Sequence, residues 1–198
     1  NDLSDAKTFG TSSIMIGDNA TGTIDAANYN TGVGVDVFAA LTTGDDNTVV
    51  GFNAGAAITT GTKNTALGRG AGEAITTGQK NVTIGYNSGK LTTTGEKNVA
   101  VGSYSLDANT TGDNNTAIGQ SALGANTTAD NNTAVGINAL TVNTTGTQNV
   151  AVGANALDAN TTASNNVAVG YDALSANTTG TQNVAVGQKA LEANTTAN

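Results

Sequence analysis

Residues 115–131 read N-T-A-I-G-Q-S-A-L-G-A-N-T-T-A-D-N, and residues 132–148 repeat the pattern as N-T-A-V-G-I-N-A-L-T-V-N-T-T-G-T-Q. A glycine recurs every 17 residues without insertion, at Gly17, Gly34, Gly51, Gly68, Gly85, Gly102, Gly119, Gly136, Gly153, Gly170 and Gly187. Ser13 stands four residues before the first of them, and asparagine holds that position in the other copies, at Asn30, Asn47, Asn64, Asn81, Asn98, Asn115, Asn132, Asn149, Asn166 and Asn183. A strict period of this kind is typical of repeat architectures. We therefore expect residues 13–198 to form one array of repeats, and residues 1–12 to form a lead-in or cap.

The composition indicates which repeat architecture to expect. The chain of 198 residues has no Cys, His, Trp or Pro and few aromatic residues, so it lacks the bulky side chains of a globular core. Its abundant Thr, Asn and Gly are poor helix formers, which disfavours stacked helical pairs. Coils of two strands of about five residues, joined by tight turns, suit small side chains. The sequence predicts an all-β parallel solenoid of eleven coils, a rod of about 50 Å.

The first strand of each coil carries small and mostly apolar residues on both of its faces. Thr116 and Ile118 point to one side, while Ala117 and Gly119 point to the other. Strands that are buried on two sides have this pattern. A coil covers one face with its own second strand, so we expect a neighbouring identical chain to cover the other in a closed oligomer.

The turns and the core of each coil follow from the remaining positions. Most copies contain Thr-Thr-Gly before the next repeat, and we expect that glycine to adopt a positive φ. Where Ala129 and Ala163 replace it, we expect Asn131 and Asn165 to adopt the left-handed conformation instead. One large aliphatic side chain per coil, such as Leu140, is expected to close each layer.

Stacking of identical coils turns each repeat position into a ladder of identical side chains. The asparagines that begin at Asn30 are expected to link amide to amide and to satisfy backbone groups in the turns. A second ladder, at the surface, is predicted where an asparagine shares a face with the second of two threonines. It comprises Asn109, Asn126, Asn143, Asn160, Asn177 and Asn194 with Thr111, Thr128, Thr145, Thr162, Thr179 and Thr196. Flat threonine arrays on solenoids bind ice, although threonine is also simply a soluble strand former.

The side chains that catalysis and metal binding require are scarce. There is no His or Cys to act as a base or nucleophile, and acids such as Asp18, Asp36 and Asp107 fall at different repeat positions. No Ca²⁺-binding nonapeptide or EF-hand loop occurs. The net charge is −8, with no basic patch and no long apolar segment. We predict no enzyme, no cofactor, no nucleic-acid partner and no membrane insertion by this segment.

The unit N-[TV]-A-[VI]-G-x-x-A resembles the head repeat of trimeric autotransporter adhesins, the YadA-like family, and similar repeats occur in bacteriophage tail fibres. The resemblance covers residues 13–198 and is clearest at Asn115-Thr116-Ala117-Ile118-Gly119 and Asn166-Val167-Ala168-Val169-Gly170. It implies a left-handed parallel β-roll in which three chains lie side by side. It also implies that the N-A-[VI]-G strand faces the threefold axis.

These observations lead to three functional hypotheses. The first is a trimeric extracellular rod, the head or shaft of a surface adhesin or phage fibre, which binds a host-surface receptor or glycan through multivalent contacts. The second is a subunit of an extracellular filament in which the open solenoid ends stack chain on chain. The third is an ice-binding solenoid that uses the Asn and Thr ladders. In the first, the segment is part of a longer chain at the surface of a cell or virion.

Overall fold

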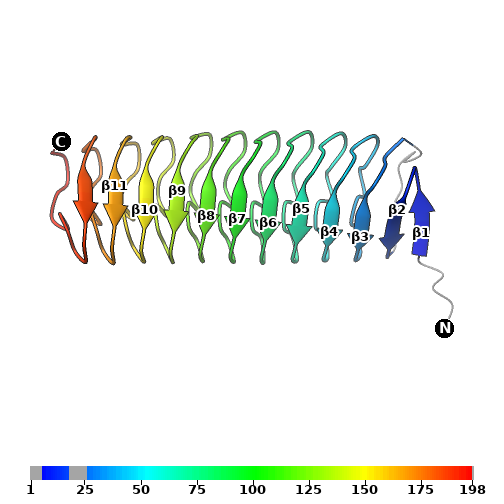
Figure 1. Cartoon of the computed structure of the whole chain (residues 1–198), viewed down its shortest axis with the longest axis horizontal. Coiled ribbons are helices and arrows are strands. Elements are labelled where there is room, and N and C mark those ends of the chain that lie inside the picture. Colours follow the sequence, from blue (N-terminus) through cyan, green and yellow to red (C-terminus); the bar gives the residue numbers. More distant parts are fainter. Residues whose placement is uncertain (1–5, 18–25, 198) are drawn as a thin grey trace.

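The computed structural model describes residues 6–17 and 26–197, and these form a straight stack of laps with one strand each (Figure 1). One sheet contains all of the described strands in sequence order, β1 to β12. They are β1 (Ala6–Phe9), β2 (Ser13–Ile16), β3 (Thr31–Val33), β4 (Thr48–Val50), β5 (Thr65–Leu67), β6 (Val82–Ile84), β7 (Val99–Val101), β8 (Thr116–Ile118), β9 (Thr133–Val135), β10 (Val150–Val152), β11 (Val167–Val169) and β12 (Val184–Val186). The predicted all-β parallel solenoid with a 17-residue repeat is therefore confirmed.

The parallel strands pair in register from β2 to β12, so each residue faces the residue 17 positions later. Ala117 of β8, for example, pairs with Ala134 of β9. Hydrogen bonds extend the ladder beyond the strands, since the Thr116 N–H donates to the Asn132 carbonyl at 2.8 Å. At the N-terminal end of the sheet, β1 pairs with β2 in an antiparallel arrangement and forms the edge strand.

The far side of each described lap consists of turns, so the predicted second strand of about five residues is wrong. The cause is the backbone conformation at fixed positions in the lap. In the lap of Gly119 the φ angles of Ser121, Leu123 and Asn131 are +57°, +52° and +61°. Left-handed residues at such short intervals prevent an extended segment. Hydrogen bonds between laps still hold the turns together, as when the Leu123 N–H donates to the Ala139 carbonyl at 3.0 Å.

The turn before each strand also differs from the prediction. The glycines of the Thr-Thr-Gly copies do not have positive φ; the residue two positions later has it instead. This holds for Asn131 and Asn165, as expected, but also for Lys80 and Gln148, with φ of +59° and +58°. The lap geometry imposes this conformation whatever the residue type, because the chain must reverse there to enter the next strand.

The repeat glycines are required both by conformation and by space. From Gly17 to Gly187 their φ angles lie between +128° and +146°, where residues with a side chain rarely occur. A Cβ on Gly119 would lie 2.5 Å from the Gly136 carbonyl oxygen of the next lap. Adjacent laps therefore touch backbone to backbone at this corner.

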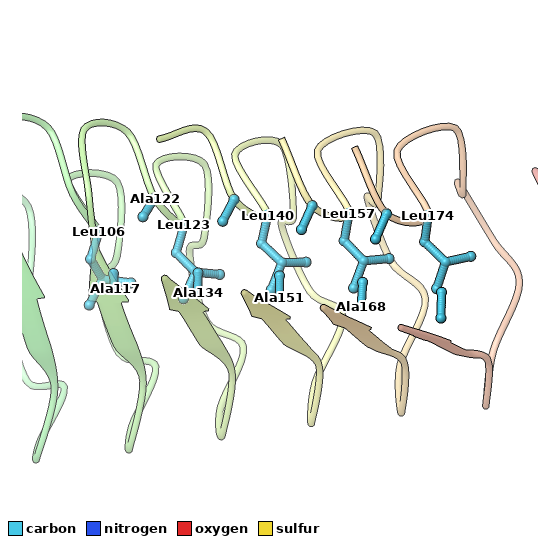
Figure 2. Close-up of a cluster of buried hydrophobic side chains, with 14 of the residues drawn as sticks. Leu106, Ala117, Ala122, Leu123, Ala134, Leu140, Ala151, Leu157, Ala168 and Leu174 are labelled. Atoms are coloured by element: carbon cyan, nitrogen blue, oxygen red, sulfur yellow. The ribbon is translucent and has the colours of Figure 1, made fainter. Parts of the chain in front are cut away.

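The core is a single file of aliphatic side chains between the sheet and the turns. In the second half, Leu106, Leu123, Leu140, Leu157 and Leu174 stack on the alanines of the strands (Figure 2). In the first half, Ile58 and Ile75 fill this space from a position three residues further along the lap. Glycine then replaces leucine, because a Cβ on Gly55 would lie 2.9 Å from Cδ1 of Ile58.

One lap interrupts the apolar core. Leu91 is 49% exposed, whereas Thr92 is buried, as are Thr83 and Ser88 of the same lap. The Ser88 hydroxyl donates to the Ala100 carbonyl at 2.8 Å, so this layer is polar but hydrogen-bonded. It separates the two apolar clusters of the described chain. The expectation of one large buried aliphatic side chain in every coil is wrong for this lap, and also for the last lap, where Leu191 is 49% exposed.

Candidate functional site

The asparagine ladder from Asn30 to Asn183 lies inside the solenoid. Each of these side chains is buried, and Asn132 is representative. Its Nδ2 donates to the Gly146 carbonyl at 2.8 Å and closes its own lap. Its Oδ1 accepts the Asn149 N–H at 3.0 Å and joins the next lap. The ladder has a structural role, because its amides satisfy backbone groups that have no access to water.

The second asparagine ladder is buried as well, and the prediction that it shares a surface with threonine is wrong. Asn109, Asn126, Asn143, Asn160 and Asn177 are buried. Asn126 Nδ2, for example, donates to the Ala129 carbonyl at 3.0 Å and to Asn109 Oδ1 at 3.0 Å. Asn194, in the last lap, donates to the Ala197 carbonyl at 3.2 Å. The turn before the strand directs these amides inward.

The threonines of that motif remain at the surface as a single row. The exposed members are Thr111, Thr128, Thr145, Thr162, Thr179 and Thr196. The preceding threonines are partly buried except for the exposed Thr195 of the last lap, and the Thr110 hydroxyl donates to the Thr127 carbonyl at 3.0 Å. The flat two-residue face of Asn and Thr that the ice-binding hypothesis requires is therefore not formed.

The outer face of the sheet is a continuous uncharged surface of the described chain. From β2 to β12 the outward positions carry Val, Ile, Leu or Thr and no charged residue. Ile118 is 40% exposed, and Val50 is 38% exposed. An uncharged face that continues along the whole stack is typical of an interaction surface.

A second surface feature is an aromatic cluster, which we define as Phe52, Arg69, Tyr86 and Tyr104. The first three directly follow the repeat glycine in successive laps. The Arg69 guanidinium carbon lies 5.8 Å from the Phe52 ring centre and 5.6 Å from that of Tyr86. Tyr86 and Tyr104 meet edge to face, with ring centres 5.2 Å apart. Sequence reasoning missed this cluster, although its 17-residue spacing was a visible signal.

Beside the aromatic cluster is a depression of about 140 Å³, which we call the polar hollow. It is lined by Phe52, Asn53, Arg69, Gly70, Glu73, Tyr86, Asn87 and Lys90. Lys90 Nζ lies 3.7 Å from Glu73 Oε2 at its edge. Beyond this ion pair is an apolar hollow of about 400 Å³, lined by Ala56, Ala57, Glu73, Ala74, Lys90 and Leu91. The exposed Leu91 of the irregular lap thus forms part of the same surface.

The charge of the chain is unevenly distributed around this surface. Residues 63–97 contain five of the seven basic residues and two of the fifteen acids, which gives this segment a net charge of +3. The whole chain has a net charge of −8. The only arginine of the chain is Arg69, in the aromatic cluster. The hollows therefore lie in a locally cationic part of an acidic rod.

Asp107 and Asp158 both lie five residues after a repeat glycine, and the pKa values of their carboxyl groups shift in the same direction. Burial raises the pKa of both carboxyls, although backbone N–H groups donate to each and oppose the shift. The folded state thus binds the proton more tightly than the unfolded chain does. Each carboxyl group therefore makes its full contribution to the free energy of unfolding below the pKa of the unfolded chain, near 3.8. This contribution is lost as the pH rises through the pKa of the folded state.

We expect Asp107→Asn to stabilise the rod modestly at pH 7, because it removes a partly desolvated charge and keeps a hydrogen-bond acceptor. The gain should disappear well below pH 3.8, where both chains are neutral at this position. Urea unfolding at the two pH values, followed by circular dichroism, measures the difference. A gain of equal size at both pH values would show that charge is not its origin.

The described residues contain no group of three or more His, Cys, Asp or Glu side chains placed to hold a metal ion. In the same part of the chain, no helix has the length and hydropathy needed to span a bilayer. Comparison with family models, with curated proteins and with solved structures found no match.

Proposed function

We propose that this chain is a rigid segment of an extracellular fibre, the head or shaft of a surface adhesin or phage tail fibre, built from three identical copies. The observation that carries the proposal is the uncharged outer face of β2–β12, which continues along the stack. Burying it between copies removes apolar surface from water, at about 25 cal/mol per Å².

A second copy is the occupant that fits this face. Symmetry about an axis along the rod places equivalent laps of each copy at the same height, so each layer meets an identical layer. Valine, isoleucine and threonine then meet the same small side chains in every layer. The number three is supported by the resemblance of the N-[TV]-A-[VI]-G repeat to YadA-like heads, where the corresponding strands face a threefold axis.

The proposed mechanism is display rather than chemistry. A stack of laps joined by backbone hydrogen bonds is stiff along its axis, and three copies repeat every surface feature around it. Weak contacts to a surface receptor or glycan then combine into strong attachment, because each later contact forms at high effective concentration. A rod of this kind acts outside the cell or on a virion.

We expect light scattering after gel filtration to give three times the 19.4 kDa mass of the chain. Val152→Lys, on the outer sheet face, should shift the protein to monomers because it would bury an unpaired charge. Thr162→Lys is the matched control, since it adds the same charge to the exposed threonine row. A folded wild-type monomer would refute the proposal, and long fibres in electron micrographs would favour the filament instead.

A further inference from the structure

We propose that the aromatic cluster and the polar hollow bind a carboxylated sugar unit of an anionic glycan. This inference rests on the proposed adhesive function and names the class of receptor it engages. The site spans the laps of Gly51, Gly68 and Gly85 and lies on the turns that follow the strands. It is thus separate from the outer sheet face assigned to contacts between copies.

The first argument is that the repeat is broken at this place. In the lap of Gly85, Leu91 lies at the surface, and Thr92 occupies the core. The laps of Gly51 and Gly85 have Asn53 and Asn87 two residues after the repeat glycine, but the lap between them has Gly70. These departures cost stability, since a polar layer replaces an aliphatic one. Departures that gather on one surface indicate function there.

The second argument is the shape that Gly70 creates. Its φ is +66°, close to the +55° and +53° of Asn53 and Asn87, so all three residues have a left-handed φ at this position. A Cβ on Gly70 would lie 2.5 Å from Asn87 Oδ1. The side chain of Asn87 therefore reaches into the space that a side chain at position 70 would take, and the amides of Asn53 and Asn87 both line the polar hollow. Amides donate and accept hydrogen bonds at once, as sugar hydroxyls require.

The third argument is the chemistry of the surrounding side chains. The Arg69 guanidinium offers a planar fork that matches a carboxylate, and the rings of Phe52 and Tyr86 on either side limit its rotamers. Phe52 is 46% exposed and Tyr86 is 39% exposed, so both rings also present apolar surface to a ligand. Exposed rings beside amides fit the alternating C–H and O–H groups of a sugar.

Charge selects among sugars. Lys90 already faces Glu73 at 3.7 Å, which leaves Arg69 as the cation of the hollow without a salt bridge to an acid. An anionic unit is attracted to the segment 63–97 and repelled by the acidic remainder of the rod. The apolar hollow beyond Lys90, with Leu91 and Ala74, would accept an acyl group or the apolar face of a neighbouring sugar.

Surface plasmon resonance on the immobilised full chain tests the inference with three probes. They are sialyllactose, a hyaluronan tetrasaccharide that carries uronic acid, and neutral lactose. We expect at least one carboxylated probe to bind about tenfold or more tightly than lactose, with an affinity that falls as salt rises. Binding of sialyllactose alone assigns the site to sialic acid, and binding of the tetrasaccharide alone assigns it to uronic acid.

Two variants locate the site. Arg69→Gln removes the carboxylate partner, and Gly70→Asn fills the hollow with the residue that both neighbouring laps carry with a left-handed φ at this position. Each should weaken binding about tenfold or more. Tyr171→Ala is the matched control, because Tyr171 also follows a repeat glycine and is 49% exposed, but lies far from the cluster. Its binding should equal that of the wild type.

The mass of each sample, measured in parallel, separates this inference from the proposed oligomer. Folded trimers that bind neither carboxylated probe, or that bind lactose equally well, would overturn the sugar site and leave the oligomer intact. Variants at Arg69 and Gly70 that bind like the wild type would overturn it too. A monomer that binds a carboxylated probe through Arg69 would sustain the site and refute the oligomer.

Discussion

Gly119→Ala is expected to destabilise the rod by about 4 kcal/mol or more, although it adds only one methyl group. The φ of Gly119 is +131°, where an alanine is strained. Its Cβ would also lie 2.5 Å from the Gly136 carbonyl oxygen and 2.6 Å from its carbon, and backbone atoms of a stacked lap cannot move away singly. Urea unfolding measures the loss, and hydrogen exchange should locate it at β8 and β9.

Gly124→Ala is the matched control in the same lap. Gly124 does not have positive φ, and the nearest atom to its added Cβ is the Ser121 carbonyl oxygen at 3.3 Å. Neighbouring laps carry Asp107 and Thr141 at the same repeat position, so a side chain fits there. The change should be neutral or stabilise by up to about 1 kcal/mol. Equal effects of the two substitutions would contradict the backbone contact between laps.

Asn64→Ala is expected to cost about 3 to 4 kcal/mol, and Asn132→Ala about 2 kcal/mol, although both residues are buried in the same ladder. Asn64 Nδ2 donates to the Gly78 carbonyl at 2.9 Å, and its Oδ1 accepts the Asn81 N–H at 3.0 Å. Alanine leaves both groups buried without these partners. In the second half of the chain, Asn143 Nδ2 also donates to the Gly146 carbonyl at 2.9 Å. After Asn132→Ala, the Gly146 carbonyl therefore keeps one of its two hydrogen bonds.

A double-mutant cycle tests this explanation by unfolding free energies. Asn143→Ala combined with Asn132→Ala removes both donors to Gly146, so the pair should lose about 1 kcal/mol more than the sum of the single losses. Additive losses would show that the second donor does not compensate. Identical costs at Asn64 and Asn132 would lead to the same conclusion.

The repeat itself was readable in the chain. The unbroken 17-residue spacing of glycine, together with small residues between Asn and Gly, predicts parallel strands that stack in register at these positions, as the structure has it, although not the second strand that was expected in each lap. A periodic sequence places identical groups in identical surroundings, so one lap determines the others. The burial of Ala117 and Leu140 follows from the same periodicity.

The direction of the second asparagine ladder was not readable. The side chains of Asn126 and Thr128 point to the same face only if the segment is an extended strand. The left-handed residues of each lap prevent that conformation. The aromatic cluster was overlooked for a related reason, because its residues differ in type and become neighbours only when laps stack.

The sequence by itself therefore determined the period, the parallel pairing and the aliphatic side chains that fill the core of the regular laps, because these depend on spacing alone. Only the tertiary structure decided which polar side chains turn inward and that Phe52, Arg69 and Tyr86 meet. It also decided that Leu91 lies at the surface while Thr92 fills the core. The physical reason is that left-handed residues such as Leu123 redirect the chain within each lap, and contacts with the adjacent laps impose that conformation rather than the preference of the residue.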